Sequence, residues 1–338
     1  MPRSLFLRGL FMVPLAALGA CNTVVMKPSG DIAAQQSHLI AVSTLLMLLI
    51  IVPVIALTVL FAWRYRKGNS AASYAPDWDH STVLELLIWG GPLLIIIVLG
   101  LLTWIATHTL DPYRPLQRLD ARRPLPATVK PLEVQVVALD WKWLFIYPEQ
   151  GIATVNELAA PVDVPINFKI SASSVMNSFF IPALAGQIYA MPGMETQLHG
   201  VINKPGIYDG FSSNYSGAGF SGMRFKFHGL SGEDFAQWVQ GAKRSTVQLD
   251  RAAYAALEKP STRDKVRYYG AVEDGLYSAI VNRCVDRNAV CMNEMMSENA
   301  TRVARHRSSA ELAAERAAQR LTQAASGVEC ASPETRKN

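Results

Sequence analysis

The chain has 338 residues, half of them apolar, and a mean hydropathy of +0.15. This hydropathy is high for a soluble protein and low for one wholly embedded in lipid, so we expect one part in a membrane and another in water. The formal net charge of +5 is spread along the chain. Its basic residues are not interleaved with aromatic ones on a long face, which argues against nucleic acid as a partner.

Residues 1–20 have the features of a secretory signal peptide. Arg3 and Arg8 precede the apolar run LFMVPLAALGA, which ends in small residues before Cys21. The tetrapeptide LGAC, Leu18–Cys21, resembles the bacterial lipobox, in which the cysteine thiol is diacylated and becomes the first residue of the mature chain. The alternative is an ordinary cysteine in an uncleaved signal anchor. Because all four positions fit, we expect a lipid anchor on Cys21, on the periplasmic side of the inner membrane.

The segment 21–110 contains two predicted transmembrane helices, at about 38–63 and 83–105. Both exceed the ~20 residues that cross a bilayer, and their only charge is Glu85. Basic residues in the intervening loop indicate a cytoplasmic loop, but arginines also follow the second span. The lipobox decides the orientation, because two crossings return the chain to the periplasm after about residue 108.

The remainder divides by composition. Residues 111–131 are rich in proline and charge and are typical of a linker. Short alternating strands with regular turn signals over 132–231 predict an all-β sandwich. Helical spacing over 232–295 predicts a helical C-terminal arm. Residues 296–338 are predicted to form an Ala-rich helix followed by a disordered tail.

Three long stretches resemble a known family. Two membrane helices followed by a periplasmic sandwich is the layout of subunit II of haem–copper oxidases. The stretches DWKWLFIYPEQGIATVNELAAP, VMNSFFIPALAGQIYAMPGMETQLH and PGIYDGFSSNYSGAGFSGMRF resemble its ubiquinol oxidase branch, the cytochrome bo type. The resemblance runs from the lipobox to about residue 290. It implies a cupredoxin-like Greek-key sandwich on a two-helix transmembrane hairpin.

In cytochrome c oxidase members of this family, one loop holds a dinuclear copper centre. Its pattern is Cys-x-Glu-x-Cys-x-x-x-His-x-x-Met, with a further histidine on an earlier strand. In this chain Ser212 and Ser216 stand at the two thiolate positions, and Asn214 stands at the glutamate position. Phe220 stands at the histidine position, Met223 at the methionine position and Asn177 at the earlier histidine position. Such copper is held by soft thiolates and imidazoles, and one thioether is a weak ligand. The resemblance and this chemistry together predict no metal and no other cofactor in this chain, with Met223 filling a gap in the core.

The missing donors have a functional consequence. Without the copper centre the chain cannot relay electrons from cytochrome c, whereas a membrane quinol can reduce a haem in subunit I directly. The resemblance therefore implies a non-redox subunit II of a proton-pumping ubiquinol oxidase that braces and caps subunit I. Haems and a copper are expected in subunit I, subunits III and IV are further expected partners, and cytochrome c is not one. The alternatives are a cytochrome c oxidase subunit II with an atypical metal site and a membrane-anchored periplasmic binding lipoprotein.

Glu85 has two compatible interpretations. With Thr82 it matches a capping box at the start of the second membrane helix. In the family, a subunit II glutamate at this place lies near the mouth of a proton-uptake channel, which makes Glu85 a candidate for proton uptake.

The aromatic and cysteine residues are less specific. The stretch WKWLF includes Trp141, Trp143 and Phe145, which match the electron-entry aromatics of copper-containing relatives. Packing is the favoured interpretation here. His199 and His228 lie in no ligand cluster. Cys284 and Cys291 are a possible disulfide in an oxidising compartment, and Cys330 is left over.

Overall fold

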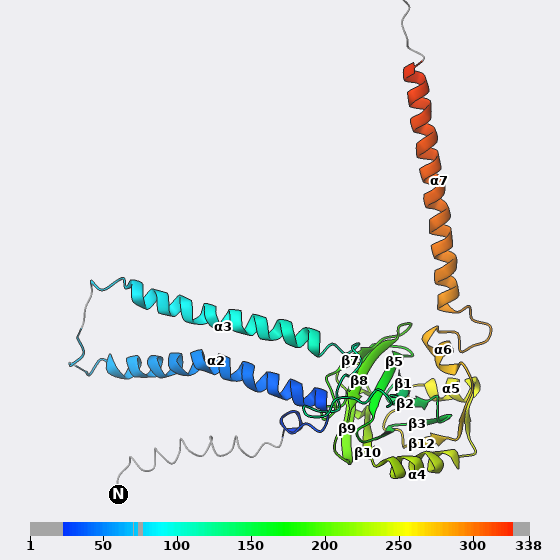
Figure 1. Ribbon diagram of the computed structural model, residues 1–338, viewed down its shortest axis with the longest axis horizontal. Helices are drawn as coiled ribbons and strands as arrows, with labels where there is room; N and C mark the ends of the chain where they lie inside the picture. Colours follow the sequence, from blue (N-terminus) through cyan, green and yellow to red (C-terminus); the bar gives the residue numbers. More distant parts are fainter. Residues whose placement is uncertain (1–22, 70, 74–76, 327–338) are drawn as a thin grey trace, which may run out of the picture.

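A computed structural model describes residues 23–69, 71–73 and 77–326. The predicted signal peptide, Cys21 and Cys330 lie outside these residues. Figure 1 shows three parts: a two-helix hairpin, a β-sandwich with its C-terminal arm, and a long helix that extends away from the sandwich.

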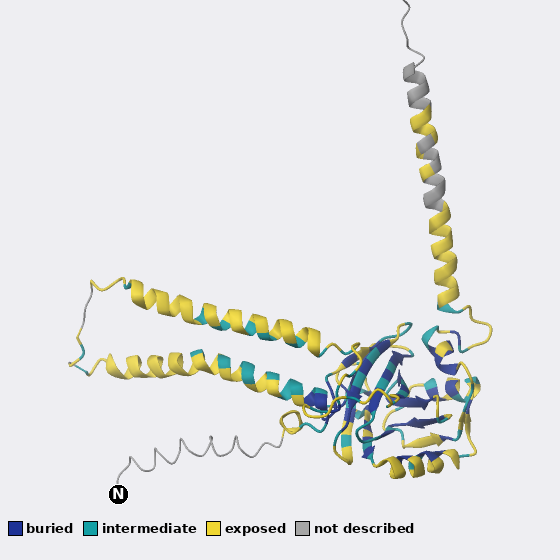
Figure 2. Cartoon of the chain, viewed as in Figure 1, coloured by how far each residue is buried: buried dark blue, intermediate teal, exposed yellow. Residues whose placement is uncertain are grey.

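The hairpin consists of α2 (Asp31–Arg64) and α3 (Thr82–Thr109), preceded by the short 3₁₀ helix η1 (Val24–Met26). Both helices are long and apolar enough to cross a membrane. Each extends past the predicted span on the periplasmic side, α2 by starting at Asp31 and α3 by ending at Thr109. Their apolar side chains are largely exposed (Figure 2), as expected for surfaces that face lipid or another membrane subunit.

Two sheets form the sandwich, which confirms the predicted fold class. The first has the strand order β12-β3-β2-β1-β5-β8 and the second the order β4-β10-β9-β6-β7. The first sheet contains β1 (Leu132–Leu139), β2 (Lys142–Tyr147), β3 (Ile152–Val155), β5 (Pro165–Ala172), β8 (Thr196–Val201) and β12 (Arg267–Tyr269). The second contains β4 (Glu157–Pro161), β6 (Asn177–Phe180), β7 (Ile188–Ala190), β9 (Gly206–Ser212) and β10 (Arg224–Leu230). The chain crosses between the sheets from β3 to β4, from β4 to β5, from β5 to β6, from β7 to β8 and from β8 to β9, as in a Greek key.

Four aromatic side chains fill the space between the sheets. Trp143 and Phe145 come from β2, Phe179 from β6 and Phe225 from β10, and all are buried. Phe225 stacks on Phe179 with ring centroids 5.5 Å apart and lies 5.0 Å from the Phe145 ring. Such contacts add to the stabilisation from apolar burial.

The C-terminal arm is not helical throughout, which corrects the prediction for 232–295. The helices α4 (Gly232–Lys243), α5 (Arg251–Glu258) and α6 (Leu276–Val281) alternate with β11 (Gln248–Leu249), β12 and β13 (Ala271–Val272). Strand β12 pairs with β3 and completes the first sheet, so the arm is part of the sandwich. A three-residue strand is too short to produce an alternating pattern, and its pairing partner lies more than a hundred residues away.

The helix α7 (Met292–Ser326) covers the Ala-rich segment and begins before residue 296. It extends away from the sandwich (Figure 1).

Candidate functional site

The six positions that the family resemblance aligns with copper ligands lie on β6, at the end of β9 and in the loop that follows β9. Asn177 starts β6, and Ser212 ends the neighbouring strand β9. The loop from β9 to β10 includes the 3₁₀ turn η2 (Phe220–Gly222), and its ends meet where the Ser212 N–H donates to the Met223 carbonyl at 3.2 Å. A backbone hydrogen bond therefore joins the two ends of the loop.

Neutral hydrogen bonds join the two innermost polar positions. The Ser212 hydroxyl lies 3.1 Å from Asn177 Oδ1 and 3.3 Å from the Asn214 carbonyl, and it accepts weakly from the Ser178 N–H at 3.4 Å. Asn177 Nδ2 donates to the Val175 carbonyl at 3.1 Å. Both side chains are almost completely buried. Their polar atoms have protein partners, as burial requires.

The remaining positions offer no ligand set for copper. Phe220 has no lone pair, and its ring packs edge-on against Tyr215. Met223 is 1% exposed and belongs to the sandwich core. Ser216 Oγ is buried without a hydrogen-bond partner among the described residues. No group of three or more His, Cys, Asp or Glu side chains that could hold a metal occurs in the described part of the chain. These residues do not fit a dinuclear copper centre, which needs soft anionic and imidazole donors.

Trp141 lies over the same loop. Its indole Nε1 donates to the Ser216 carbonyl at 3.0 Å. A Cβ atom on Gly219 would lie 2.4 Å from Trp141 Cδ2 and 2.6 Å from Thr262 Cγ2, so only glycine permits this approach. The arm residue Thr262 thus lies beside Trp141, while Trp143 and Phe145 are fully buried. This environment supports the packing interpretation of these aromatics.

A buried lysine holds the arm next to this loop. Lys142 Nζ donates to the Lys259 carbonyl at 2.8 Å and to Ser261 Oγ at 2.5 Å, and it lies 3.9 Å from the Asp264 carboxylate. The side chain is 1% exposed, and burial lowers the pKa of its ammonium group. Sequence reasoning missed this contact. The one available signal was a charged residue within the otherwise apolar stretch WKWLF.

A second polar cluster, also missed, joins the arm to the sandwich. Glu157 Oε1 on β4 accepts hydrogen bonds from Trp238 Nε1 at 2.9 Å and from the Tyr268 hydroxyl at 2.5 Å. His228 Nε2 lies 3.7 Å from Glu157 Oε2, which gives this histidine a structural partner. His199 on β8 is half-buried, and burial lowers its pKa. Neither histidine lies near the copper-loop positions in a ligand arrangement.

The capping box predicted at Glu85 is wrong. The N-cap of α3 is Ser81, and Thr82 is already the first helical residue, so the spacing to Glu85 does not match. Glu85 Oε1 instead lies 2.8 Å from His80 Nδ1, and both side chains are more than half exposed. The carboxylate therefore stands at the loop end of α3, outside any cap.

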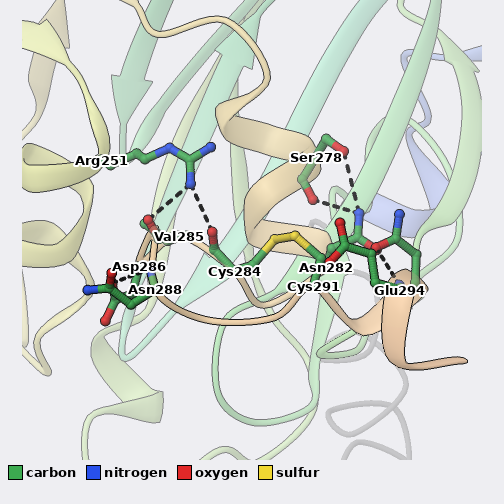
Figure 3. Close-up of a disulfide and its surroundings, with 10 residues drawn as sticks. Arg251, Ser278, Asn282, Cys284, Val285, Asp286, Asn288, Cys291 and Glu294 are labelled. Atoms are coloured by element: carbon green, nitrogen blue, oxygen red, sulfur yellow. Dashed lines mark hydrogen bonds between the residues drawn. A yellow bond between two sulfur atoms is a disulfide. The ribbon is translucent and has the colours of Figure 1, made fainter. Parts of the chain in front are cut away.

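Cys284 and Cys291 form a disulfide between α6 and α7 (Figure 3). Arg251 Nη1 donates to the Cys284 carbonyl at 2.8 Å and to the Val285 carbonyl at 3.1 Å. The Met292 N–H donates to the Asn282 carbonyl at 2.9 Å. The first turn of α7 is thereby attached to the arm.

Comparison with known proteins gives the same assignment along most of the chain. Residues 133–228 match the family described as "Cytochrome C oxidase subunit II, periplasmic domain", and residues 243–288 match the "COX Aromatic Rich Motif". The chain is 52% identical over 266 residues to "Cytochrome bo(3) ubiquinol oxidase subunit 2" of Pseudomonas putida, which covers 79% of this chain and 82% of that protein. It is 48% identical to the protein of the same name from Pseudomonas aeruginosa, over 82% of this chain and 81% of that protein. It is 51% identical to "Ubiquinol oxidase subunit 2" of Acetobacter aceti, over 78% of this chain and 83% of that protein. The chain therefore belongs to the ubiquinol oxidase subunit 2 family of the haem–copper oxidases.

Proposed function

We propose that this chain is the redox-silent subunit 2 of a proton-pumping ubiquinol oxidase of the bacterial inner membrane. The observation that carries the proposal is the hydrogen-bonded pair of Ser212 and Asn177, which occupies the innermost ligand positions with neutral groups. A dinuclear copper centre has no donors there. The chain braces subunit I through the membrane hairpin and caps it with the periplasmic sandwich.

Electrons then enter the complex without passing through this chain. Quinol reduces a haem in subunit I, where the haems and a copper reside, and oxygen is reduced to water there. Subunits III and IV complete the assembly. Cytochrome c is not a donor, because no relay centre connects the periplasmic face with subunit I.

Copper counting and donor preference test this proposal together. The purified oxidase is incubated with excess copper and washed, and copper is then measured on this chain after it has been separated from its partners. We expect no copper on the chain, and reduction of the complex by ubiquinol but not by reduced cytochrome c. A dinuclear centre on this chain, or rapid reduction by cytochrome c, would establish the cytochrome c oxidase alternative.

Co-purification addresses the alternative of a free-standing binding lipoprotein. An affinity-tagged full-length chain is isolated from membranes in mild detergent. We expect haem-containing subunit I to accompany it in equal amounts, with the optical spectrum of an oxidase. Isolation of the chain without haem would favour the binding lipoprotein.

Glu85 has a proposed role of its own in proton uptake. The observation in its favour is an exposed carboxylate at the loop end of α3, paired only with the exposed His80 among the described residues. Glu85→Gln should lower the rate of proton uptake from the cytoplasmic side in reconstituted vesicles, with Asp79→Asn, which neutralises an exposed carboxylate of the same loop, as the matched control. Equal uptake rates in the wild type and Glu85→Gln would contradict this role.

Cys21 is the proposed site of lipid attachment. Intact-mass measurement of the mature chain should show cleavage before Cys21 and the added mass of acyl groups. Cys21→Ala should lose this mass. An unmodified chain that begins at Met1 would instead identify an uncleaved signal anchor.

A further inference from the structure

Three consecutive apolar side chains are exposed on the short helix η1, which precedes the first membrane helix. Val24 is 52% exposed, Val25 is 38% exposed and Met26 is 51% exposed. Apolar residues that are scattered singly over a surface need no explanation, whereas a contiguous exposed group indicates contact with another apolar phase. We call Val24–Met26 the apolar segment.

Hydrogen bonds attach the residues that follow the apolar segment to the sandwich. The N–H groups of Ser29 and Gly30 both donate to the Ala183 carbonyl, at 3.0 and 2.9 Å. The Asn203 N–H donates to the Ser29 carbonyl at 2.8 Å. A Cβ atom on Gly30 would lie 2.6 Å from the Val201 carbonyl oxygen, so only glycine permits this close approach. The sandwich therefore holds the end of the apolar segment in a fixed place.

From this attachment the apolar segment lies back along α2, on the side toward the membrane (Figure 1). Ser37 Oγ on α2 lies 3.9 Å from Met26 Sδ. The helix begins at Asp31, and with a rise of about 1.5 Å per residue Ser37 lies about 9 Å nearer to the membrane centre than that residue. Met26 is therefore at the level of His38, where the uncharged span begins.

A tryptophan on the other membrane helix indicates that this level is the outer headgroup layer. Leu39 on α2 and Ile105 on α3 line one cleft, so these two residues lie at similar heights. Trp104 precedes Ile105 and is exposed, and tryptophans of membrane helices are enriched at the boundary between lipid and water. The apolar side chains next to Met26 thus lie where the acyl chains of the outer leaflet begin.

We propose that the apolar segment inserts into the outer leaflet of the membrane, where its three side chains contact phospholipid. An apolar surface binds a bilayer interface with a strength that scales with the apolar area it buries there. Cys21 lies shortly before Val24 in the sequence, and acyl chains on its thiol would enter the same leaflet. The choice of lipid over a partner subunit rests on this proposed acylation. Because the sandwich holds the segment, insertion adds a support for the periplasmic domain beside the two membrane helices.

Depth-dependent fluorescence quenching in the whole oxidase tests this inference. Val24→Cys is labelled with an NBD fluorophore in a Cys330→Ser background, and the complex is reconstituted in phospholipid vesicles. Nitroxides near the top of the lipid acyl chains quench from within the leaflet, and iodide quenches from water. We expect strong quenching by the nitroxide lipid and protection from iodide. Met26→Cys is labelled in the same way if the first variant fails to assemble, and the Cys330→Ser parent corrects for label on other thiols.

Val247→Cys is the matched control. Val247 is also an exposed valine, 53% exposed, but it lies in the C-terminal arm between α4 and β11. Its label should be quenched by iodide, and the nitroxide lipid should quench the Val24 label severalfold more than the Val247 label.

Equal quenching by iodide at Val24 and Val247 would overturn the proposal. Protection of Val24 from both quenchers would also overturn it, and would indicate that a partner subunit covers the apolar segment. The intact mass of the chain in the same preparation reports acylation of Cys21 separately. Quenching of Val24 by the nitroxide lipid in an unacylated chain would support the insertion and reject only the proposed lipid anchor.

Discussion

Two parts of the periplasmic domain hold distant segments in different ways. The copper-loop end is held by neutral groups, with Ser212 and Asn177 bonded to each other above the aromatic core. The arm junction depends on ionisable groups, with buried Lys142 donating to the Lys259 carbonyl and Glu157 accepting from Trp238. The two regions differ in the free-energy cost of removing one hydrogen-bonding side chain.

This difference follows from the cost of desolvation. A neutral hydrogen bond contributes about 0.5–1.5 kcal/mol, and its loss leaves at most one unsatisfied dipole. A buried charge that loses its partners costs several times more. We therefore expect the copper-loop end to tolerate substitution better than the arm junction, which sequence reasoning overlooked.

The largest effect is expected at Lys142. Lys142→Met leaves the Lys259 carbonyl and Ser261 Oγ without their donor, while Asp264 keeps its pair with Arg267. The unsatisfied polar groups should cost about 3 kcal/mol of unfolding free energy. This corresponds to a decrease in unfolding temperature of roughly 6–12 °C. Hydrogen exchange of residues 259–264 in the purified oxidase should rise with it. Lys130→Met, which removes an exposed pair with Glu149, is the control and should change the unfolding temperature little. Equal effects of the two substitutions would show that the arm does not depend on the buried cation.

The second-largest effect is expected from removing the disulfide at the start of α7. Cys284 and Cys291 are separated by seven positions, and the chain-entropy relation for so short a loop gives about 2.5 kcal/mol. The double substitution Cys284→Ser and Cys291→Ser should free the first turn of α7 and increase proteolysis around residue 290. Limited proteolysis of the oxidase, with and without reductant, measures this. If the wild type is equally protected in reductant, the hydrogen bonds from Arg251 are sufficient to hold the segment.

The membrane hairpin and the sandwich could be predicted from the sequence. The two apolar runs, charged only at Glu85, exceed the length of a bilayer, and the alternating strands are long enough to show their period. The six positions that the family resemblance aligns with copper ligands follow a spaced pattern in one loop and one strand, and the structure brings Ser212 and Asn177 of this set together. Lys142 and Glu157 could not be predicted in the same way, because their partners lie about a hundred residues away and form no local motif. The strand β12 was missed for the same reason, and the cap at Glu85 was wrong because a one-residue shift of the helix start is invisible in the pattern.

A smaller effect is expected at Ser212. Ser212→Ala removes the partner of Asn177 Oδ1 and should cost about 1 kcal/mol. Ser216→Ala is a matched control in the same loop, since its hydroxyl is buried without a partner among the described residues, and the change should be neutral or slightly stabilising. Thermal unfolding of the two variants compares them directly. A loss at Ser216 as large as that at Ser212 would mean that the loop depends on a contact other than this pair.

The smallest effect concerns the linker, where a charged contact is exposed instead of buried. Both terminal nitrogens of Arg123 donate to the Asp163 carboxylate at 2.8 Å, and Asn203 Nδ2 donates to it at 2.9 Å. The hydrogen bonds from Arg123 are the main reason that the pKa of Asp163 is lowered. A lowered pKa in the folded state means that this contact stabilises the fold above the unfolded pKa of about 3.9 and is lost as the pH falls through the folded value.

Arg123→Gln should therefore lower the unfolding temperature at pH 7 by less than Ser212→Ala does, since the charged pair is exposed and screened by solvent. The difference from the wild type should begin to shrink below about pH 4, where Asp163 becomes protonated in the unfolded chain, and should disappear as the pH falls through the lowered folded pKa. Unfolding temperatures measured at pH 7 and pH 3 give this comparison, and the gap should also narrow at high salt because exposed charges are screened. A constant gap at both pH values would mean that Arg123 stabilises the linker by packing alone. In that case the contrast between a neutral loop and a charge-dependent junction would apply to Lys142 and Glu157 only, and not to the linker.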